Sequence, residues 1–166
     1  ILNIFHIHAD RVQVANIAQL VNVLQALFLT EGDKMLLTPT YHVFDMYKVH
    51  HDATMLPVEI SSPTYSRLGK SIPSLSVSAS RDKNGAVNVS FVNIDPNQSV
   101  EISCNLKDVK GKLASANIIT APKTDSYNTF DNPNQVVLKE FKSGSFKNGI
   151  LKIKIPEKSV VTVQIK

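Results

Sequence analysis

The second half of the chain alternates apolar and polar residues with a period of two, the pattern of a strand with one buried face. Val87, Val89 and Phe91 fall on one face of such a strand, whereas Asn88 and Ser90 fall on the other. The same alternation recurs at residues 75–79, 102–106, 151–155 and 161–165. Turn-forming residues separate these runs at positions 82–85, 95–98, 148–149 and 156–158. Short strands with one apolar face at this spacing predict an antiparallel β-sandwich.

Length and composition are those of a globular protein. The 166 residues suffice for one good-sized domain, or for one domain with an appendage. Hydrophobic residues make up 43% and charged residues 19%, which excludes a largely disordered chain. The net charge is +4, but the lysines are scattered and no aromatic residues interleave with them, so nucleic-acid binding is not expected. The longest apolar run, residues 14–29, is too polar and too short to span a bilayer.

The first seventy residues follow a different pattern. Apolar residues at positions 1, 4 and 5 indicate the end of an amphipathic helix, and "FLTEGDKMLL" resembles a hairpin around Gly32. A second helix is predicted from Thr40, as its N-cap after Pro39, to about His51. The stretch between is ambiguous, because residues 17–28 have helical spacing while residues 12 and 14 alternate as in a strand. Periodicity alone favours a helix after Ala15.

Two further features have an ordinary structural interpretation. Residues 115–134 contain two prolines and many turn formers, which predicts an irregular surface excursion between strands. We expect Tyr127 and Phe130 to pin this loop to the sandwich rather than to bind a ligand. Cys104 is the only cysteine, so it forms no internal disulfide and is expected to be a small buried hydrophobe.

No catalytic or metal-binding pattern emerges from the polar residues alone. His6 and His8 are spaced like a metal pair but have no third ligand, so we expect hydrogen-bonded histidines near a helix C-terminus. Residues 50–52, two histidines and an aspartate, suggest a solvated helix end. Asp10 and Arg11 are expected to form local hydrogen bonds or a salt bridge. Neither a G-x-S-x-G motif nor a phosphate-binding loop is present, and no metal or cofactor is expected.

A longer pattern is more specific than these motifs. The stretch "HADRVQVANIAQLVNVLQALFLTEGDKMLLTPTYHVFDMYKVHHDA", followed by "SSPTY", "SASRDKNGAVNVSFVNIDPNQSVEI" and "NTFDNPN", resembles the C-terminal part of α-L-arabinofuranosidases of glycoside hydrolase family 51. The resemblance extends over essentially the whole chain. Members of that family combine a (β/α)8 barrel with a C-terminal β-sandwich of jelly-roll type. The resemblance therefore implies a mainly β chain in which a short α/β remnant of the barrel precedes the sandwich.

The resemblance also implies a domain division and one ligand residue. Residues 1–52 would be the last βα segment of the barrel, comprising a helix end, a strand, a hairpin and a helix, and residues 53–166 would be the sandwich. Residues 11–18 would form the eighth barrel strand, which overrules the helix favoured by periodicity. Gln19 would then lie at the C-terminal end of that strand, where barrel enzymes build their active sites. There the family has a glutamine that hydrogen-bonds the arabinofuranose, and an amide suits sugar hydroxyls because it both donates and accepts.

The family's reaction requires residues that this chain is not expected to contain. Retaining glycosidases use two glutamates about 5 to 5.5 Å apart, and the family places both on earlier barrel strands. The glutamates here occupy hairpin, strand or turn contexts, at positions 31, 59, 101, 140 and 157. Since the chain also opens on Ile1 in the middle of a pattern, we expect a fragment that is inactive alone.

The parent protein is expected to release terminal arabinofuranosyl groups from arabinan, arabinoxylan or their oligosaccharides. Its implied partners are this substrate, the missing barrel of the same chain and further copies of itself in a homo-oligomer, with no nucleic acid, membrane, metal or cofactor. The sequence assigns no cellular location. The alternative is a noncatalytic carbohydrate-binding or adhesion sandwich. That alternative is disfavoured because such modules stack sugars on exposed aromatic rings, and the chain has no Trp and only four Tyr.

Overall fold

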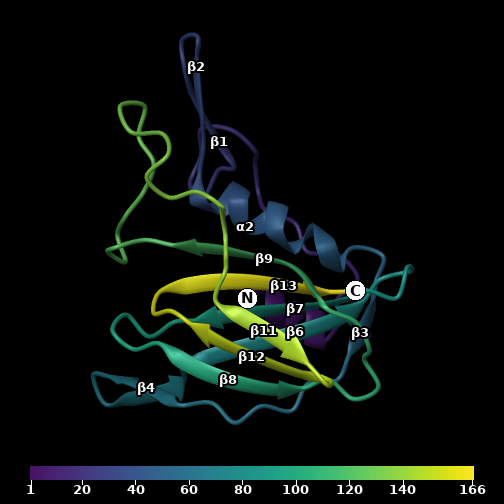
Figure 1. Ribbon diagram of the computed structural model, residues 1–166. Helices are drawn as coiled ribbons and strands as arrows, with labels where there is room; N and C mark the ends of the chain where they lie inside the picture. Colours follow the sequence, from purple (N-terminus) through teal and green to yellow (C-terminus); the bar gives the residue numbers. More distant parts are fainter.

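Two antiparallel sheets pack face to face in the computed structural model, which describes residues 1–166 (Figure 1). The larger sheet has six strands in the order β10-β9-β13-β7-β6-β3, and the smaller has three in the order β11-β12-β8. The bounds of the large sheet's strands are β3 Thr54–Leu56, β6 Leu75–Arg81, β7 Val87–Asn93, β9 Leu113–Thr120, β10 Lys139–Glu140 and β13 Ser159–Ile165. Those of the small sheet are β8 Val100–Asn105, β11 Gly144–Lys147 and β12 Ile150–Ile155. The predicted β-sandwich is confirmed.

The hydrophobic core lies between the two sheets. It consists of fourteen buried side chains from strands of both sheets, and every predicted period-two run contributes its apolar face to the core or packs against it. Phe91 of β7 and Leu151 of β12 are 1% and 0% exposed, so the centres of both sheets are sealed from water. Cys104 of β8 is half-buried against this core, and burial raises the pKa of its thiol. Its expected role as a small hydrophobe fits this position.

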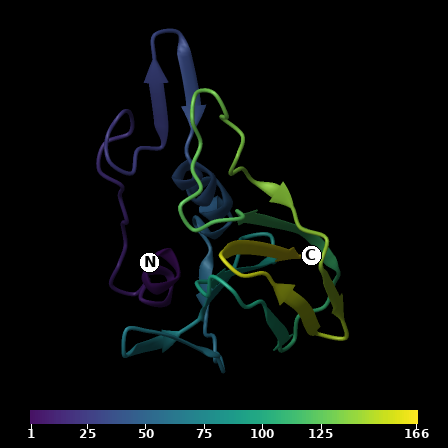
Figure 2. The same cartoon turned by 90° about the vertical axis from the view of Figure 1, so that its left-hand side faces the viewer.

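The outer face of the large sheet is buried as well, contrary to the half-buried strand that the alternation predicts. Asn88 and Ser90 on β7 are 1% and 0% exposed. Helices α1 (Leu2–Ile7) and α2 (Pro39–Tyr47) and the 3-10 helix η1 (Lys48–His50) cover this face. Figure 2 shows α1, near the N-terminus, on the side of the large sheet opposite the small one. The polar residues of β7 therefore face helices rather than solvent.

Helix α2 begins two residues earlier than the sequence predicts. Thr38 is the N-cap, its Oγ1 accepts a hydrogen bond from the Tyr41 amide at 3.3 Å, and Pro39 occupies the first helical position. The expected cap, Thr40, lies inside the helix. The predicted hairpin is confirmed as β1 (Phe28–Glu31) paired with β2 (Lys34–Leu37), and it projects away from the sandwich (Figure 1). A second hairpin, β4 (Thr64–Arg67) with β5 (Lys70–Pro73), flanks the sheets.

Residues 11–18 form neither the strand that the family resemblance implies nor the helix that periodicity favours after Ala15. Arg11 belongs to a turn, and residues 12–18 contain no helix or strand. The physical reason is the absence of a neighbour, because a strand is held by hydrogen bonds to an adjacent strand and no strand of either sheet lies beside this segment. Val14 is consequently 71% exposed.

The region 115–134 divides into a strand and a loop. Residues 115–120 belong to β9, which pairs with β13, so the irregular excursion starts later than predicted and occupies residues 121–138. Tyr127 is 65% exposed and does not pin this loop, whereas Asn128 is 4% exposed and does. Phe130 is half-buried, and the bonds that fasten the loop are those of the Asn128 amide to Leu37 and Val136.

The helices are short. The longest, α2, has nine residues, and none combines the length and apolar character that a membrane span requires.

Candidate functional site

Gln19 lies in an exposed loop that leads from the irregular segment to the β1–β2 hairpin. Its backbone is left-handed, with φ of 48°, and Asn22 and Gln25 in the same loop have φ of 54° and 63°. Asn adopts this conformation readily, but it is uncommon for a long side chain such as Gln and costs on the order of 1 kcal/mol. Because Gln19 is exposed, its amide is open to a ligand. Gln19 thus combines an exposed side chain with an unusual backbone conformation.

The amide of Asn22 has a structural role in that loop. Its Nδ2 donates to Thr30 Oγ1 at 2.9 Å and to the Thr30 carbonyl at 3.1 Å, while its Oδ1 accepts from the Thr30 amide at 2.8 Å. These three bonds fasten the loop to β1. The Asn22 side chain therefore stabilises the fold of the loop and is not free to bind a ligand.

Backbone hydrogen bonds connect the loop to the hairpin on the other side. The Leu20 carbonyl accepts from the amides of Leu27 and Phe28 at 3.1 and 3.2 Å, and a short parallel bridge joins Val21 to Phe28. Thr38 Oγ1, the cap of α2, donates to the carbonyl of Ala26 at 2.7 Å. The residue after Gln19 is thus bonded to the hairpin, and the loop is bonded to the start of α2.

A polar cluster between the helices and the large sheet holds the N-terminal region against the sandwich. Asn3, 2% exposed, donates from Nδ2 to the Ser76 carbonyl at 3.0 Å, and its Oδ1 accepts from Tyr47 Oη at 2.7 Å and Ser78 Oγ at 2.9 Å. His6 Nδ1 lies 3.1 Å from Ser78 Oγ. Each buried polar atom named here has a partner, so burying them on this face is tolerated.

His50 belongs to this cluster, which corrects the prediction of a solvated helix end at residues 50–52. Its Nδ1 lies 2.7 Å from Ser80 Oγ and its Nε2 lies 2.6 Å from Ser90 Oγ. Burial, followed by the nearby His6 and His51 side chains, lowers the pKa of His50 to about 4. Both His51 and Asp52 are exposed, as predicted. Sequence patterns do not distinguish His50 from them, because the two serines lie 30 and 40 residues away.

The remaining titratable residues do not assemble a metal site. His6 lies in the last turn of α1, where its hydrogen bond fits the expectation, and burial lowers its pKa. His8 is exposed. No three His, Cys, Asp or Glu side chains converge as a metal ion would require. Asp10 and Arg11 make local hydrogen bonds, one of the two predicted alternatives, since the Arg11 amide donates to the His8 carbonyl at 3.0 Å and the Asp10 carbonyl accepts from Gln13 at 3.5 Å. They form no salt bridge with each other.

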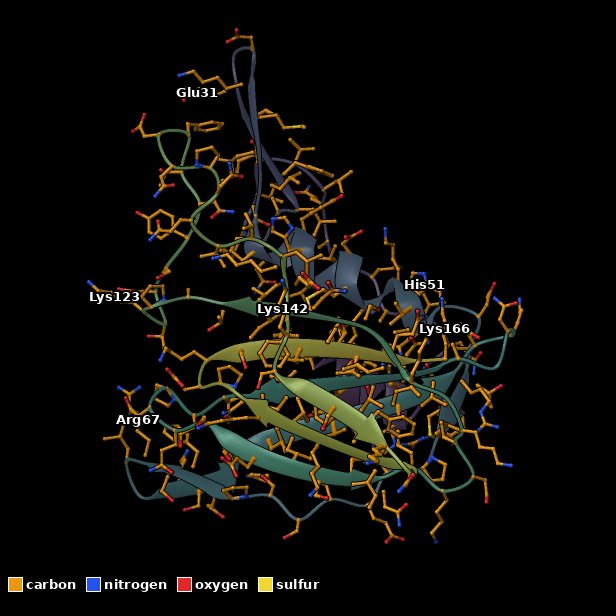
Figure 3. All side chains as sticks on the ribbon, in the orientation of Figure 1. Glu31, His51, Arg67, Lys123, Lys142 and Lys166 are labelled. Carbon is orange, nitrogen blue, oxygen red and sulfur yellow. The ribbon has the colours of Figure 1, made fainter.

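The glutamates form no pair of the kind that a retaining glycosidase uses. Three of them approach lysines instead, Glu140 at 3.5 Å from Lys142, Glu101 at 4.0 Å from Lys154 and Glu157 at 3.7 Å from Lys158. Figure 3 shows a fourth, Glu31, near the far end of the hairpin. The glutamates at positions 31, 59, 101 and 140 are exposed. These four therefore lack the water-excluded setting that the carboxyl groups of a glycosidase active site occupy.

A hollow of about 450 Å³ at the end of the sandwich contains none of the residues discussed above. It is lined by the loop at residues 105–111 and by the turn between β11 and β12, and most of its lining is polar. Binding sites for small molecules are generally enclosed and mostly apolar. The hollow therefore offers no second candidate site.

Comparison with known proteins agrees with this architecture, a β-sandwich that carries helices and a projecting hairpin. A family model described as "Alpha-L-arabinofuranosidase C-terminal domain" matches residues 1–159. The chain belongs to this family of arabinofuranosidase C-terminal domains. It is 45% identical over 165 residues to an intracellular exo-α-L-arabinofuranosidase of Bacteroides ovatus, and these residues are 99% of this chain but 32% of that protein.

Solved structures give the same result. The family 51 arabinofuranosidase from Xanthomonas axonopodis pv. citri superposes with a TM-score of 0.95 at 39% identity, over 99% of this chain and 33% of that one. A family 51 enzyme from Bifidobacterium longum shares the fold, with a TM-score of 0.85 at 24% identity over 96% of this chain and 32% of its own. The chain thus spans about a third of the length of the relatives it matches.

Proposed function

We propose that the chain is the C-terminal portion of a retaining α-L-arabinofuranosidase that releases terminal α-L-arabinofuranosyl groups from arabinan, arabinoxylan or their oligosaccharides. The observation that supports this most strongly is the match, over 99% of the chain, to one third of the Bacteroides ovatus exo-acting enzyme at 45% identity. The structural match to the Xanthomonas enzyme covers the same share of the chain. The chain alone is inactive in this proposal, since its glutamates form no catalytic pair.

The proposal divides the chain between two domains of the full-length enzyme. Residues 1–52 complete the (β/α)8 barrel and residues 53–166 form the sandwich. The exposed apolar side chains of the segment before the hairpin support this division, because Val14 is 71%, Leu20 51% and Leu24 91% exposed. Apolar surface of this kind is buried when a neighbouring element is present. In the full-length enzyme that element is the rest of the barrel. The family resemblance also leads us to propose that the full-length enzyme assembles into a homo-oligomer.

Gln19 is the residue of this chain that contacts the sugar in the proposed mechanism. Two glutamates of the barrel perform the double displacement: one protonates the leaving oxygen, the other attacks the anomeric carbon, and water then hydrolyses the glycosyl-enzyme. Gln19 offers two N–H donors and a carbonyl acceptor to the arabinofuranose hydroxyls. Its exposure and its left-handed backbone support this role. No metal or cofactor enters the proposed reaction.

Hydrolysis of an aryl α-L-arabinofuranoside tests the proposal. The full-length protein is expected to release the phenol, the 166-residue chain is expected to release none, and Gln19→Ala in the full-length protein should lower kcat/KM by about 10²-fold. Gln25→Ala, in the same loop and also left-handed, is the matched control and should keep kcat/KM within about twofold. A full-length protein that hydrolyses no arabinofuranoside would contradict the proposed function. Retention of the isolated sandwich on arabinoxylan would also contradict it, because such binding indicates a carbohydrate-binding module.

A further inference from the structure

The loop at residues 121–138, between β9 and β10, contacts the hairpin that follows the Gln19 loop. Figures 1 and 2 both show it rising from the sandwich beside β1 and β2. One buried side chain makes the connection: Asn128 Nδ2 donates to the Leu37 carbonyl, the last of β2, at 2.8 Å. The same amide donates to the Val136 carbonyl at 2.9 Å and accepts from the Val136 amide at 2.7 Å. Asn128 thus closes its own loop and ties it to the hairpin.

Three consecutive hydrogen-bonded steps lead from this contact to the Gln19 loop. Asn128 holds Leu37, and the next residue along the chain, Thr38, donates its amide to the Leu27 carbonyl at 3.1 Å. The Leu27 amide in turn donates to the Leu20 carbonyl at 3.1 Å. Leu20 is the residue immediately after the proposed sugar ligand. A side chain of the sandwich is therefore connected by short, direct bonds to the backbone at the candidate site.

We propose that Asn128 is a positioning residue through which the β-sandwich sets the conformation of Gln19 for sugar binding. This inference rests on the proposed function, in which Gln19 binds the arabinofuranose. Gln19 is exposed and has a left-handed backbone, so the loop has little packing of its own to hold that shape. The bonds that Leu20 and Leu27 make hold it, and Asn128 links those bonds to the sandwich beside the second link that α2 provides through Thr38.

Asn128→Asp in the full-length protein tests the proposal. A carboxylate can still accept from the Val136 amide, but it cannot donate to the Leu37 and Val136 carbonyls, which it instead repels. We expect kcat/KM to fall about tenfold, mainly through a higher KM, because the Gln19 loop no longer keeps its binding shape. Asn134→Asp, the same change at an exposed position of the same loop, should stay within about twofold. Should Asn128→Asp fail to fold, Asn128→Ala removes the amide's bonds to Leu37 and Val136 without adding a charge and carries the same expectation.

A double-mutant cycle separates positioning from general destabilisation. In a Gln19→Ala background, Asn128→Asp should lower kcat/KM by no more than about twofold, because the side chain that it positions is gone. An undiminished tenfold loss in that background would overturn the inference while leaving the proposed function intact, and so would a loss no larger than that of Asn134→Asp. If Gln19→Ala itself leaves kcat/KM unchanged, the proposed role of Gln19 fails, and the inference fails with it.

Discussion

Individual polar residues of β7 explain how the helices stay on the sheet. Asn88 Nδ2 donates to the Val49 carbonyl at 3.2 Å, and Ser90 Oγ lies 2.6 Å from His50 Nε2. Apolar contacts between the helices and the sheet would be non-directional. Hydrogen bonds require particular directions and lengths, so they specify one arrangement of the helices on the sheet. The cost is that each group needs its partner, since a buried polar atom left alone costs about 1–3 kcal/mol.

The buried position of His50 makes the stability of the chain dependent on pH. Its pKa is about 4 in the folded chain and the usual value of a histidine is 6.5, so the unfolded state binds the proton more readily. The stabilisation is complete above pH 6.5 and is lost as the pH falls from 6.5 to about 4. We expect this group to remove about 1–3 kcal/mol from the free energy of unfolding over that window.

Urea unfolding at a series of pH values measures this effect. His50→Gln should flatten the decline in the free energy of unfolding between pH 6.5 and 4, whereas His51→Gln, at the exposed neighbouring position, should preserve most of it. Equal slopes for the wild type and His50→Gln would show that the imidazole titrates as it does in the unfolded chain.

At the scale of elements, the sheets could be predicted from the sequence and the covering of their outer face could not. Alternation identifies the strands because inward residues such as Val87 and Val89 must be apolar. The alternation does not show whether the outer face of a sheet is exposed to solvent or hydrogen-bonded to helices, since the residues are polar in both cases. The same limit applies to Asn128, which is unremarkable until the fold brings it to Leu37, 91 positions away in the sequence.

The connection between β8 and β9 contains the glycine whose replacement is expected to be most disruptive. Gly111 has φ of 138°, and a Cβ there would overlap the backbone of Lys166, which pairs with Lys112 through two hydrogen bonds of 2.7 and 3.0 Å. Gly111→Ala should therefore lower the free energy of unfolding by more than about 1 kcal/mol. Gly144→Ala in β11, where a Cβ meets only ordinary contacts at 3.5 Å and beyond, should change it little. Thermal unfolding of the two variants tests this difference, and equal melting temperatures would contradict the expected overlap.

In the molecule as a whole, the sandwich has a closed hydrophobic core, whereas the segment before the hairpin has no strand partner. Both sheets share one sealed core, and the helices and hairpin are bonded to the large sheet and its loop. Residues 12–18 lack strand partners and expose apolar side chains. The family resemblance predicted the sandwich correctly, but the strand that it implied at residues 11–18 is not formed. A strand needs a hydrogen-bonded neighbour, and the alternation at residues 12 and 14 does not reveal whether one is present.

A structure of the full-length protein with bound arabinose would show whether Gln19 binds sugar in a barrel that residues 1–52 complete. We expect residues 11–18 to form a strand between two barrel strands, with the Gln19 amide about 2.7–3.2 Å from a sugar hydroxyl. Arabinose bound with Gln19 turned away from it, or residues 11–18 still without strand partners, would rule out this role of the chain.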